Sequence, residues 1–456
     1  MRATQPISSP DLPITALLAE RSAALRAADL PAEIRAVVRQ CLLDWFGVSL
    51  AGAREDLSRM IAAEAAEEGG KPVATLVGHG AKAPALLAAL VNGATSHALD
   101  YDDVHLVYVG HPTVALVPAL LALGEAQGAS GEDFLTAFVA GYETICRIGR
   151  LIMPGHYALG FHATATIGGF GAAAACARLL GLDRDKTAMA YGIAATQAAG
   201  LKSMFGTMCK PLHAGKASQN GLLAARLAAR GFSSRPDALE CAQGFALTHG
   251  PDFHPEAALA DPPGGYYVRG NLFKYHAACY LTHAPIECAR QIAARPGFAS
   301  DAVRAIQLRI DRGADKVCNI QTPRTGLEAK FSLRLTIALA LAGVDTASLA
   351  TYTAERTAEP RLVALRDKVR INFEDGWSTS RAEMQVTLAD GSTLDAKADS
   401  GIPAPDVAAQ GKRIEAKFLS LASPVLGEPG ARRLMEAVAG LDKLRSLAEL
   451  AALARA

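Results

Sequence analysis

Apolar residues recur at helical spacing through roughly the first 265 residues of this chain. Between Ile34 and Trp45 they return every three or four positions, and Pro31 stands where a proline in a first helical turn is tolerated. This pattern predicts a helix that ends near Gly47. Similar stretches follow, separated by turns with Gly or Pro: 85–91, 114–126, 134–150, 164–180, 186–199 and 217–230. Because alternating β-branched residues are missing, a parallel sheet with crossover helices is disfavoured here.

The pattern changes at the linker-like stretch Asp261-Pro262-Pro263-Gly264-Gly265. Beyond it, four segments alternate like strands, and the last two are joined by Asp390-Gly391, which is a hairpin signal. These segments are 303–310, 368–373, 382–388 and 392–396. The stretch 327–341 between them is helical in pattern, and helical spacing returns from Ala404 onward.

A chain of 456 residues is too long for a typical single core, so two domains are the natural expectation. We predict a mainly α fold with an α+β insertion. An all-helical domain would be built from both termini, residues 1–265 and 404–456, and a smaller α+β lid domain would span residues 266–403.

Composition narrows the possible partners. A formal net charge of +1, without a basic stripe or an acidic tail, argues against nucleic acid and against an anionic membrane surface. We therefore expect a small-molecule substrate. The 8 cysteines are scattered without a C-x-x-C pair, as is typical of a protein in a reducing compartment.

Two segments bear on location. Residues 1–11 are polar and lack an apolar signal core, so we expect a cytoplasmic protein. The Ala-rich run 163–182 contains several glycines and Arg178, and we interpret it as a buried helix of a soluble protein rather than a membrane span.

The most polar stretch lies between two strongly apolar helical segments, from Asn92 to Thr113. Carboxylates and imidazoles held beside a core need partners, and such pairing shifts their pKa values toward those that acid/base chemistry requires. The alternative is a solvated loop between two helices. The residues concerned are His97, Asp100, Asp102, Asp103, His105 and His111.

Three further segments carry residues capable of chemistry. His162 comes just before an Ala/Gly-rich helix, whose positive dipole end favours a neutral imidazole. Lys210, His213 and Lys216 lie in a Gly-flanked segment that we expect to open a helix at about Ala217, an arrangement suited to a carboxylate or phosphate. Lys274, at the start of the second domain, either reaches toward the polar stretch or is an ordinary solvated cation.

Familiar cofactor motifs do not fit. The segment around Gly215-Lys216 is not a P-loop, because Lys210 stands where the first Gly belongs and Ala217 where Ser or Thr would bind magnesium. Gly169-Phe170-Gly171 matches a relaxed dinucleotide fingerprint, but its surroundings are helical, which favours tight helix packing. Histidines and aspartates of the polar stretch could ligate a divalent metal, although their spacing matches no defined site.

With these segments in order, the chain resembles the MmgE/PrpD family, which includes 2-methylcitrate dehydratase, cis-aconitate decarboxylase and iminodisuccinate epimerase. The resemblance covers most of the chain. The matching segments are Asp44 to Gly52, Asn92-Gly93, His97-Ala98-Leu99-Asp100-Tyr101-Asp102-Asp103, His111-Pro112-Thr113, Gly160-Phe161-His162-Ala163-Thr164, Gly206-Thr207-Met208, Lys210 to Gly215, Pro323 and Glu328 to Ser332.

The resemblance implies a homodimer that acts on a small polycarboxylate without metal or organic cofactor. The catalytic residues that it implies are Asp100, His111, His162, Lys210 and Lys274. We add as candidate substrate-binding residues His213, Lys216, His105 and Tyr101.

Two positions depart from the decarboxylase pattern. Val104 replaces a Thr, and Val317-Cys318-Asn319 stands where a lid Tyr is expected, which weighs against decarboxylation of cis-aconitate. The chemistry of the family begins at a carbon beside a carboxylate, where a cationic clamp and a nearby base are needed. We therefore predict a lyase of the dehydratase type, with a dicarboxylate epimerase as runner-up. A decarboxylase, a metal-dependent enzyme and a protein that only binds a polycarboxylate are further alternatives.

Overall fold

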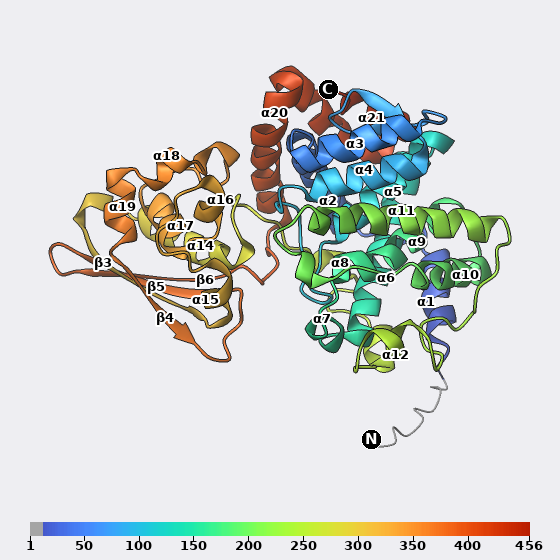
Figure 1. Ribbon diagram of the computed structural model, residues 1–456, viewed down its shortest axis with the longest axis horizontal. Helices are drawn as coiled ribbons and strands as arrows, with labels where there is room; N and C mark the ends of the chain where they lie inside the picture. Colours follow the sequence, from blue (N-terminus) through green and yellow to red (C-terminus); the bar gives the residue numbers. More distant parts are fainter. Residues whose placement is uncertain (1–11) are drawn as a thin grey trace, which may run out of the picture. The chain divides into compact units, whose positions relative to one another are not determined.

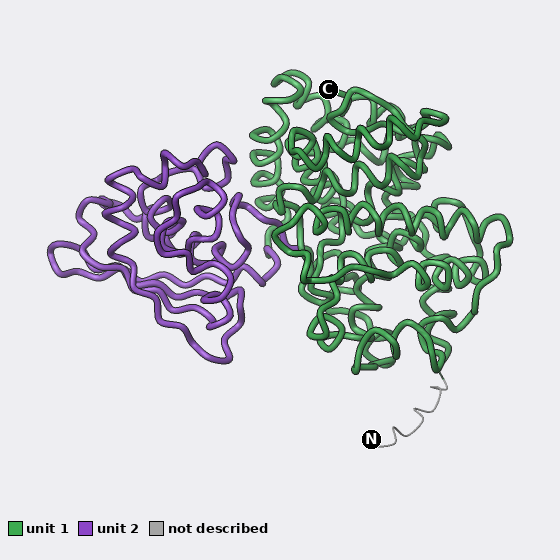
Figure 2. The backbone as a smooth tube through the Cα atoms, in the orientation of Figure 1, with its two compact units in different colours: residues 1–271, 405–456 green, residues 272–404 purple. Residues whose placement is uncertain are grey.

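The computed structural model describes residues 12–456 as two compact units (Figures 1 and 2). Unit 1 is built from both ends of the chain, up to Asn271 and from Pro405 onward, and unit 2 comprises Leu272–Ala404. The predicted fold class, mainly α with an α+β insertion, is confirmed. The N-terminal stretch interpreted as lacking a signal core, residues 1–11, lies outside the described residues.

Unit 1 is a helical assembly. Its α-helices are α1 Ile14–Ala24, α2 Ala32–Gly52, α3 Asp56–Glu68, α4 Ala85–His97, α5 Pro112–Gln127, α6 Gly131–Ile152, α7 Gly155–Ala158, α8 Ala163–Thr166, α9 Gly168–Leu179, α10 Arg184–Ala195, α11 Cys209–Ala229, α12 Phe245–His249, α13 Pro255–Leu259, α20 Val407–Ala439 and α21 Leu447–Leu453. Its 3₁₀ turns are η1 Ala27–Asp29, η2 Lys202–Met204, η3 Tyr267–Gly270 and η7 Leu441–Lys443. We predicted an all-helical unit, but β1 Ala74–Leu76 and β2 Ala81–Ala83 form a short antiparallel pair in it.

Local sequence sets the ends of these helices. Ser130 and Asp133 form a capping box at the start of α6, which satisfies two otherwise unpaired N–H groups. Pro112 opens α5, and Gly128 closes it in the left-handed conformation (φ 68°). From Pro112 to Glu125, α5 is buried on every side, so it is a central helix of unit 1.

Three predicted helix boundaries in unit 1 are wrong. Helix α2 runs five residues past the predicted end at Gly47, because that glycine packs against Phe418 of α20 inside the helix. The predicted single helix 164–180 is broken at Ile167 into α8 and α9. Helix α11 begins at Cys209 and not at Ala217, since Pro211 falls in its first turn, where a missing N–H costs nothing.

Unit 2 is a mixed sheet with helices packed against it. The strands are β3 Val303–Asp311, β4 Val369–Glu374, β5 Arg381–Leu388 and β6 Thr393–Asp399, in the order β4-β3-β5-β6. The helices are α14 His283–Ala293, α15 Gly313–Cys318, α16 Gly326–Lys330, α17 Leu333–Leu341, α18 Ala354–Thr357 and α19 Pro360–Arg366, with η4 Tyr280–Thr282, η5 Ser300–Ala302 and η6 Leu349–Thr351. The predicted hairpin is confirmed, with antiparallel β5 and β6 and Gly391 at φ 85° in the turn.

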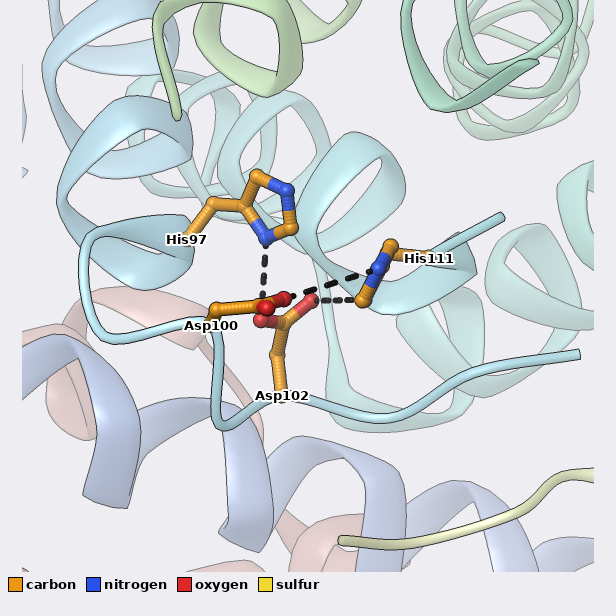
Figure 3. A group of neighbouring side chains, drawn as sticks. All are labelled: His97, Asp100, Asp102 and His111. Carbon is orange, nitrogen blue, oxygen red and sulfur yellow. Dashed lines mark hydrogen bonds and ion pairs between the residues drawn. The ribbon is translucent and has the colours of Figure 1, made fainter. Parts of the chain in front are cut away.

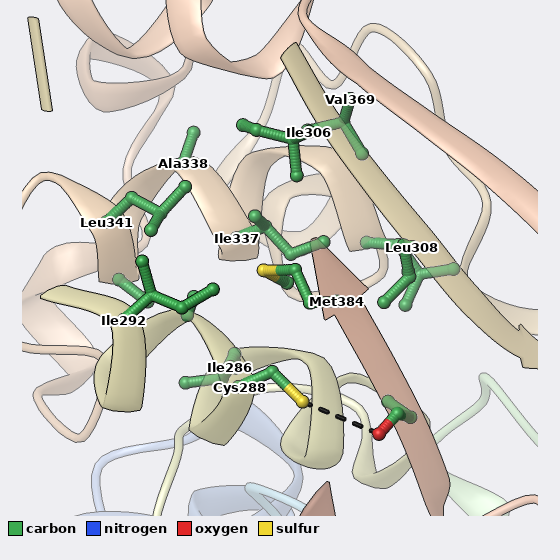
Figure 4. Packing of buried hydrophobic residues seen from close by; sticks show 14 of the residues in the cluster. Ile286, Cys288, Ile292, Ile306, Leu308, Ile337, Ala338, Leu341, Val369 and Met384 are labelled. Atoms are coloured by element: carbon green, nitrogen blue, oxygen red, sulfur yellow. Dashed lines mark hydrogen bonds between the residues drawn. The ribbon is translucent and has the colours of Figure 1, made fainter. Parts of the chain in front are cut away.

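The core of unit 2 forms where α14 and α17 meet the sheet. Ile292 and Leu341 from the helices lie in one buried cluster with Ile306, Leu308 and Met384 from the strands (Figure 4). The sequence did not predict α14 or the parallel pairing of β3 with β4. The predicted helix 327–341 is divided, because the Ser332 hydroxyl caps a new helix, α17, by accepting from the N–H of Leu335.

None of the helices between residues 12 and 456 combines the length and the apolar character that crossing a bilayer would require. The Ala-rich run 163–182 belongs instead to two short helices of unit 1, α8 and α9.

Candidate functional site

The site begins where α4 crosses α11 at very short range. A Cβ on Gly93 would lie 2.7 Å from the Cα of Gly215, and one on Gly215 would lie 2.3 Å from the Leu90 carbonyl oxygen. Only glycine fits at such a crossing. The contact brings His97, the last residue of α4, toward Lys210 in the first turn of α11.

Asp102 stands between two imidazoles (Figure 3). Its Oδ1 is 2.9 Å from Nδ1 of His97, in a hydrogen bond, and its Oδ2 is 2.8 Å from Nδ1 of His111. Burial opposes ionisation of Asp102, but His111 and His97 outweigh it and hold its pKa well below the usual range. Asp102 is therefore a buried carboxylate with an imidazole at each oxygen.

Asp100 binds the Lys210 ammonium, which is the cation of the site. Its Oδ1 accepts a hydrogen bond of 2.7 Å from the Lys210 ammonium and lies 3.8 Å from Nε2 of His111. Asp100 adopts a left-handed backbone conformation (φ 49°), which non-glycine residues rarely do and which is frequent at functional sites. Its half-exposed side chain leaves the Lys210–Asp100 pair open to a ligand.

A second imidazole pair adjoins the first. His162, the residue before α8, and His213 in α11 have their Nδ1 atoms 3.0 Å apart, so one nitrogen donates and the other accepts. The ring of His162 is stacked 6.1 Å from that of His97. Burial first, and then the neighbouring positive groups, lower the pKa of His162 far below the usual value, so this imidazole is neutral.

The C-terminal segment anchors the loop that carries the aspartates. Lys417 of α20 is buried, donates to the Tyr101 carbonyl oxygen at 2.7 Å and pairs with Asp44 of α2 at 2.6 Å. Its ammonium also lies 3.9 Å from the centre of the Tyr101 ring. The expectation that the C-terminus packs on the first domain is thereby confirmed, and this packing fixes the backbone between Asp100 and Asp102.

Asp103 behaves unlike its neighbour. Its carboxyl accepts a 2.5 Å hydrogen bond from the Thr113 hydroxyl. Burial raises the pKa of Asp103 to about 8, helped by the negative charges of Asp44 and Asp102. At neutral pH it is therefore mainly a neutral acid that ties the loop to the start of α5.

The residues proposed to bind substrate differ in their surroundings. His105 is buried, and both its ring nitrogens are used within the protein, by the Tyr267 carbonyl oxygen and the N–H of Val107. Tyr101 is buried, whereas Lys216 is exposed and donates to Gln219. Their roles in binding remain predictions.

The structure brings five predicted residues together: Asp100, His111, Lys210, His162 and His213. Two residues that were not predicted as site residues join them, His97 and Asp102. Both stand in the polar stretch, but their sequence positions do not reveal that they pair with each other. Lys274, which belongs to unit 2, is buried, and its part in catalysis remains a prediction.

A metal ion is one conceivable occupant. One nitrogen or oxygen from each of four residues, His97, Asp100, Asp102 and His111, lies within 4.8 Å of the others. The donor types suit a divalent transition metal. However, Asp100 is already paired with the Lys210 ammonium and Asp102 with His97, so these carboxylates have charge and donors without a metal.

A separate cavity of about 370 Å³ in unit 1 contains charged groups but no histidine. Its two guanidiniums, from Arg21 and Arg147, both bind Asp261 Oδ1 at 2.7 Å. The buried Glu143 also lines this cavity, and burial raises its pKa to about 7, but both guanidiniums there are bound to one carboxylate. The imidazole–aspartate cluster brings more proton-transfer groups together and is therefore the better candidate for proton chemistry.

The family models for the MmgE/PrpD N-terminal and C-terminal domains match residues 16–258 and 276–443. The chain belongs to the MmgE/PrpD family. It is 27% identical to a cis-aconitate decarboxylase of Aspergillus terreus over 92% of both chains. It is 28% identical to the human cis-aconitate decarboxylase, over 81% of this chain and 79% of that one. A cis-aconitate decarboxylase-like protein of Aspergillus oryzae is 30% identical over 62% of each chain.

These relatives confirm the predicted family and support the prediction of a lyase at the level of reaction class.

Proposed function

We propose that this MmgE/PrpD lyase eliminates a group from a small di- or tricarboxylate, without a cofactor, by taking a proton from the carbon beside a carboxylate. The observation that carries the proposal is the grouping of a partly exposed cation, Lys210, with an imidazole, His111, that is backed by the ionised Asp102.

The cation serves as the clamp. The α-hydrogen of a carboxylate is very weakly acidic, so charge moving onto the carboxylate must be stabilised. Lys210 uses one of its three N–H donors for Asp100, which leaves the others for a substrate carboxylate. Lys210 also lies in the first turn of α11, where the helix dipole favours an anion.

The imidazole serves as the base. With its Nδ1 toward Asp102, His111 presents Nε2 near Asp100 and the Lys210 ammonium. In a dehydration, Nε2 takes the proton from carbon and the C–H electron pair forms the C=C bond. The C–O bond breaks, and the hydroxyl leaves as water with a proton from Lys210. Asp102 stabilises the imidazolium that forms, as the acid of a catalytic triad does.

Dehydration, as of 2-methylcitrate, is our first choice, because the Lys210 ammonium lies at the same site as His111 and can protonate a leaving hydroxyl. Decarboxylation is the second candidate, favoured by the names of the relatives. In that reaction a C–C bond breaks, carbon dioxide leaves, and a protonated group must quench the carbanion. Val104, where the decarboxylase pattern has Thr, and Val317-Cys318-Asn319, where it has a lid Tyr, favour the first choice.

Proton NMR in deuterium oxide tests the proposal with 2-methylcitrate, citrate, cis-aconitate and iminodisuccinate as substrates. Water loss or addition supports dehydration, loss of a carboxyl carbon supports decarboxylation, and solvent exchange with inversion alone supports the epimerase alternative. His111→Ala and Lys210→Ala should lower kcat by at least about 100-fold. The exposed His254→Ala and Lys186→Ala are matched controls. Near-normal turnover in His111→Ala would remove the proposed base.

As further parts of this proposal, we propose that the protein is a homodimer and that Lys274 assists substrate binding. Light scattering tests the first part. An increase in KM for Lys274→Ala, with Lys186→Ala unchanged, tests the second.

A further inference from the structure

His97 is a buried neutral imidazole at the end of α4. Its side chain is fully buried, and burial lowers its pKa to about 4, although Asp102 acts in the opposite direction. At neutral pH it therefore carries one ring proton, on either Nδ1 or Nε2.

The hydrogen-bond partners of His97 decide which nitrogen carries the proton. Nδ1 is 2.9 Å from Asp102 Oδ1, whereas Nε2 is buried and has no hydrogen-bond partner. A buried N–H without an acceptor is rarer and costlier than an unused lone pair. The proton therefore resides on Nδ1 and is donated to Asp102.

A neutral donor has a particular effect on Asp102. It satisfies one oxygen without cancelling the charge, so the other oxygen keeps its negative charge toward Nδ1 of His111. The rings of His97 and His111 are also in edge contact, with centroids 4.5 Å apart. His97 thus fixes both the direction of the carboxylate and the space in which His111 lies.

We infer that His97 is a positioning residue, which acts through Asp102 to hold His111 with its proton on Nδ1 and its Nε2 lone pair available to substrate. The inference rests on the proposed function for its catalytic consequence, but the protonation state of His111 can be measured without any substrate.

A pair of neutral substitutions tests it. The amide nitrogen of Asn occupies about the place of a histidine Nδ1, and that of Gln about the place of Nε2. H97N therefore restores the donor to Asp102, whereas H97Q and H97L do not. Partners that orient a functional histidine typically contribute 10- to 100-fold. We expect kcat to be at least about tenfold higher in H97N than in H97Q or H97L, with KM changed less than threefold.

Nitrogen-15 NMR of labelled, ligand-free protein at neutral pH provides the second measurement. His111 should be protonated at Nδ1 in the wild type and in H97N, and should become a mixture of tautomers in H97Q. Circular dichroism and thermal unfolding identify any variant that fails to fold. H97N and H97Q are equally polar, so the comparison survives a failure of H97L.

Equal kcat in H97N and H97Q, or an unchanged His111 tautomer in H97Q, would overturn the inference. If no polycarboxylate is turned over by the wild type, the proposed function fails, while the tautomer measurement still decides the role of His97.

Discussion

Replacement by Asn is expected to affect activity strongly at Asp102 and only slightly at the adjacent Asp103. Asp102 is ionised between two imidazoles, whereas the pKa of Asp103 is raised to about 8 by burial. We therefore predict that Asp102→Asn abolishes most activity and that Asp103→Asn, which keeps a neutral group of the same shape, leaves activity within about threefold of the wild type.

The magnitude for Asp102→Asn follows from its two contacts, at 2.9 Å to His97 and 2.8 Å to His111. An amide offers one oxygen, so its NH₂ group must face one of the two Nδ1 atoms and force that imidazole into the opposite tautomer. In a Ser-His-Asp triad the same change costs about 10⁴-fold. Because the oxygen of Asn can still face one of the two imidazoles, we expect a smaller loss of about 10²- to 10³-fold in kcat, or about 3–4 kcal/mol.

For Asp103→Asn, stability provides a second readout. The folded-state pKa is raised above the unfolded value of about 3.9. The stabilising contribution of Asp103 is therefore complete below about pH 4 and is lost as pH rises toward 8. An amide removes this loss, so the variant should match or exceed the wild-type free energy of unfolding at pH 7, by up to about 4 kcal/mol.

Urea unfolding and turnover of the same polycarboxylate panel, measured for both variants at pH 5 to 8, are the assays. Similar losses of activity in Asp103→Asn and Asp102→Asn would refute the assignment of opposite charge states.

Three other predictions concern packing, pH and metals. Gly215→Ala should lower the free energy of unfolding by more than about 2 kcal/mol and lower kcat, because its Cβ would meet the Leu90 carbonyl oxygen at 2.3 Å. Gly440→Ala, where a Cβ would make only ordinary contacts at 3.5 and 3.9 Å, should leave kcat unchanged. Burial lowers the pKa of His105 to about 4, so the free energy of unfolding should fall as pH drops from about 6.5 to 4. His105→Gln should reduce the dependence of this free energy on pH by up to about 1.4 kcal/mol per pH unit, as measured by thermal or urea unfolding. Treatment with EDTA should leave turnover unchanged, because the Lys210 ammonium already occupies Asp100; loss of activity that zinc or manganese restores would favour a metal-dependent mechanism.

Helical periodicity was sufficient to predict most of the architecture, because the apolar stripe of a helix reflects its burial directly. It failed where packing overrides local preference. Gly47 and Gly215 resemble helix breakers in sequence, yet both lie inside helices since another backbone or ring approaches them closely. The parallel pairing of β3 and β4 depends on residues about 60 positions apart, which local patterns do not report.

The candidate site could be predicted only in part, because the sequence shows where acids and histidines are dense but not which of them pair. The density of acids and histidines identified the stretch around Asp100 and His111, the segments before two helices drew attention to His162 and Lys210, and the resemblance implied their catalytic roles. Pairing is a three-dimensional property, so the different states of Asp102 and Asp103, which are neighbours in sequence, became visible only with their partners His97 and Thr113. Likewise, the early start of α11 became clear only from its contact with α4.

A crystal structure with a bound di- or tricarboxylate would show whether Lys210 and His111 act on the substrate. A substrate carboxylate should lie on the Lys210 ammonium, with the reacting carbon about 3–3.5 Å from Nε2 of His111. A ligand bound at Arg21 and Arg147 instead, with the imidazole–aspartate cluster untouched, would contradict this expectation.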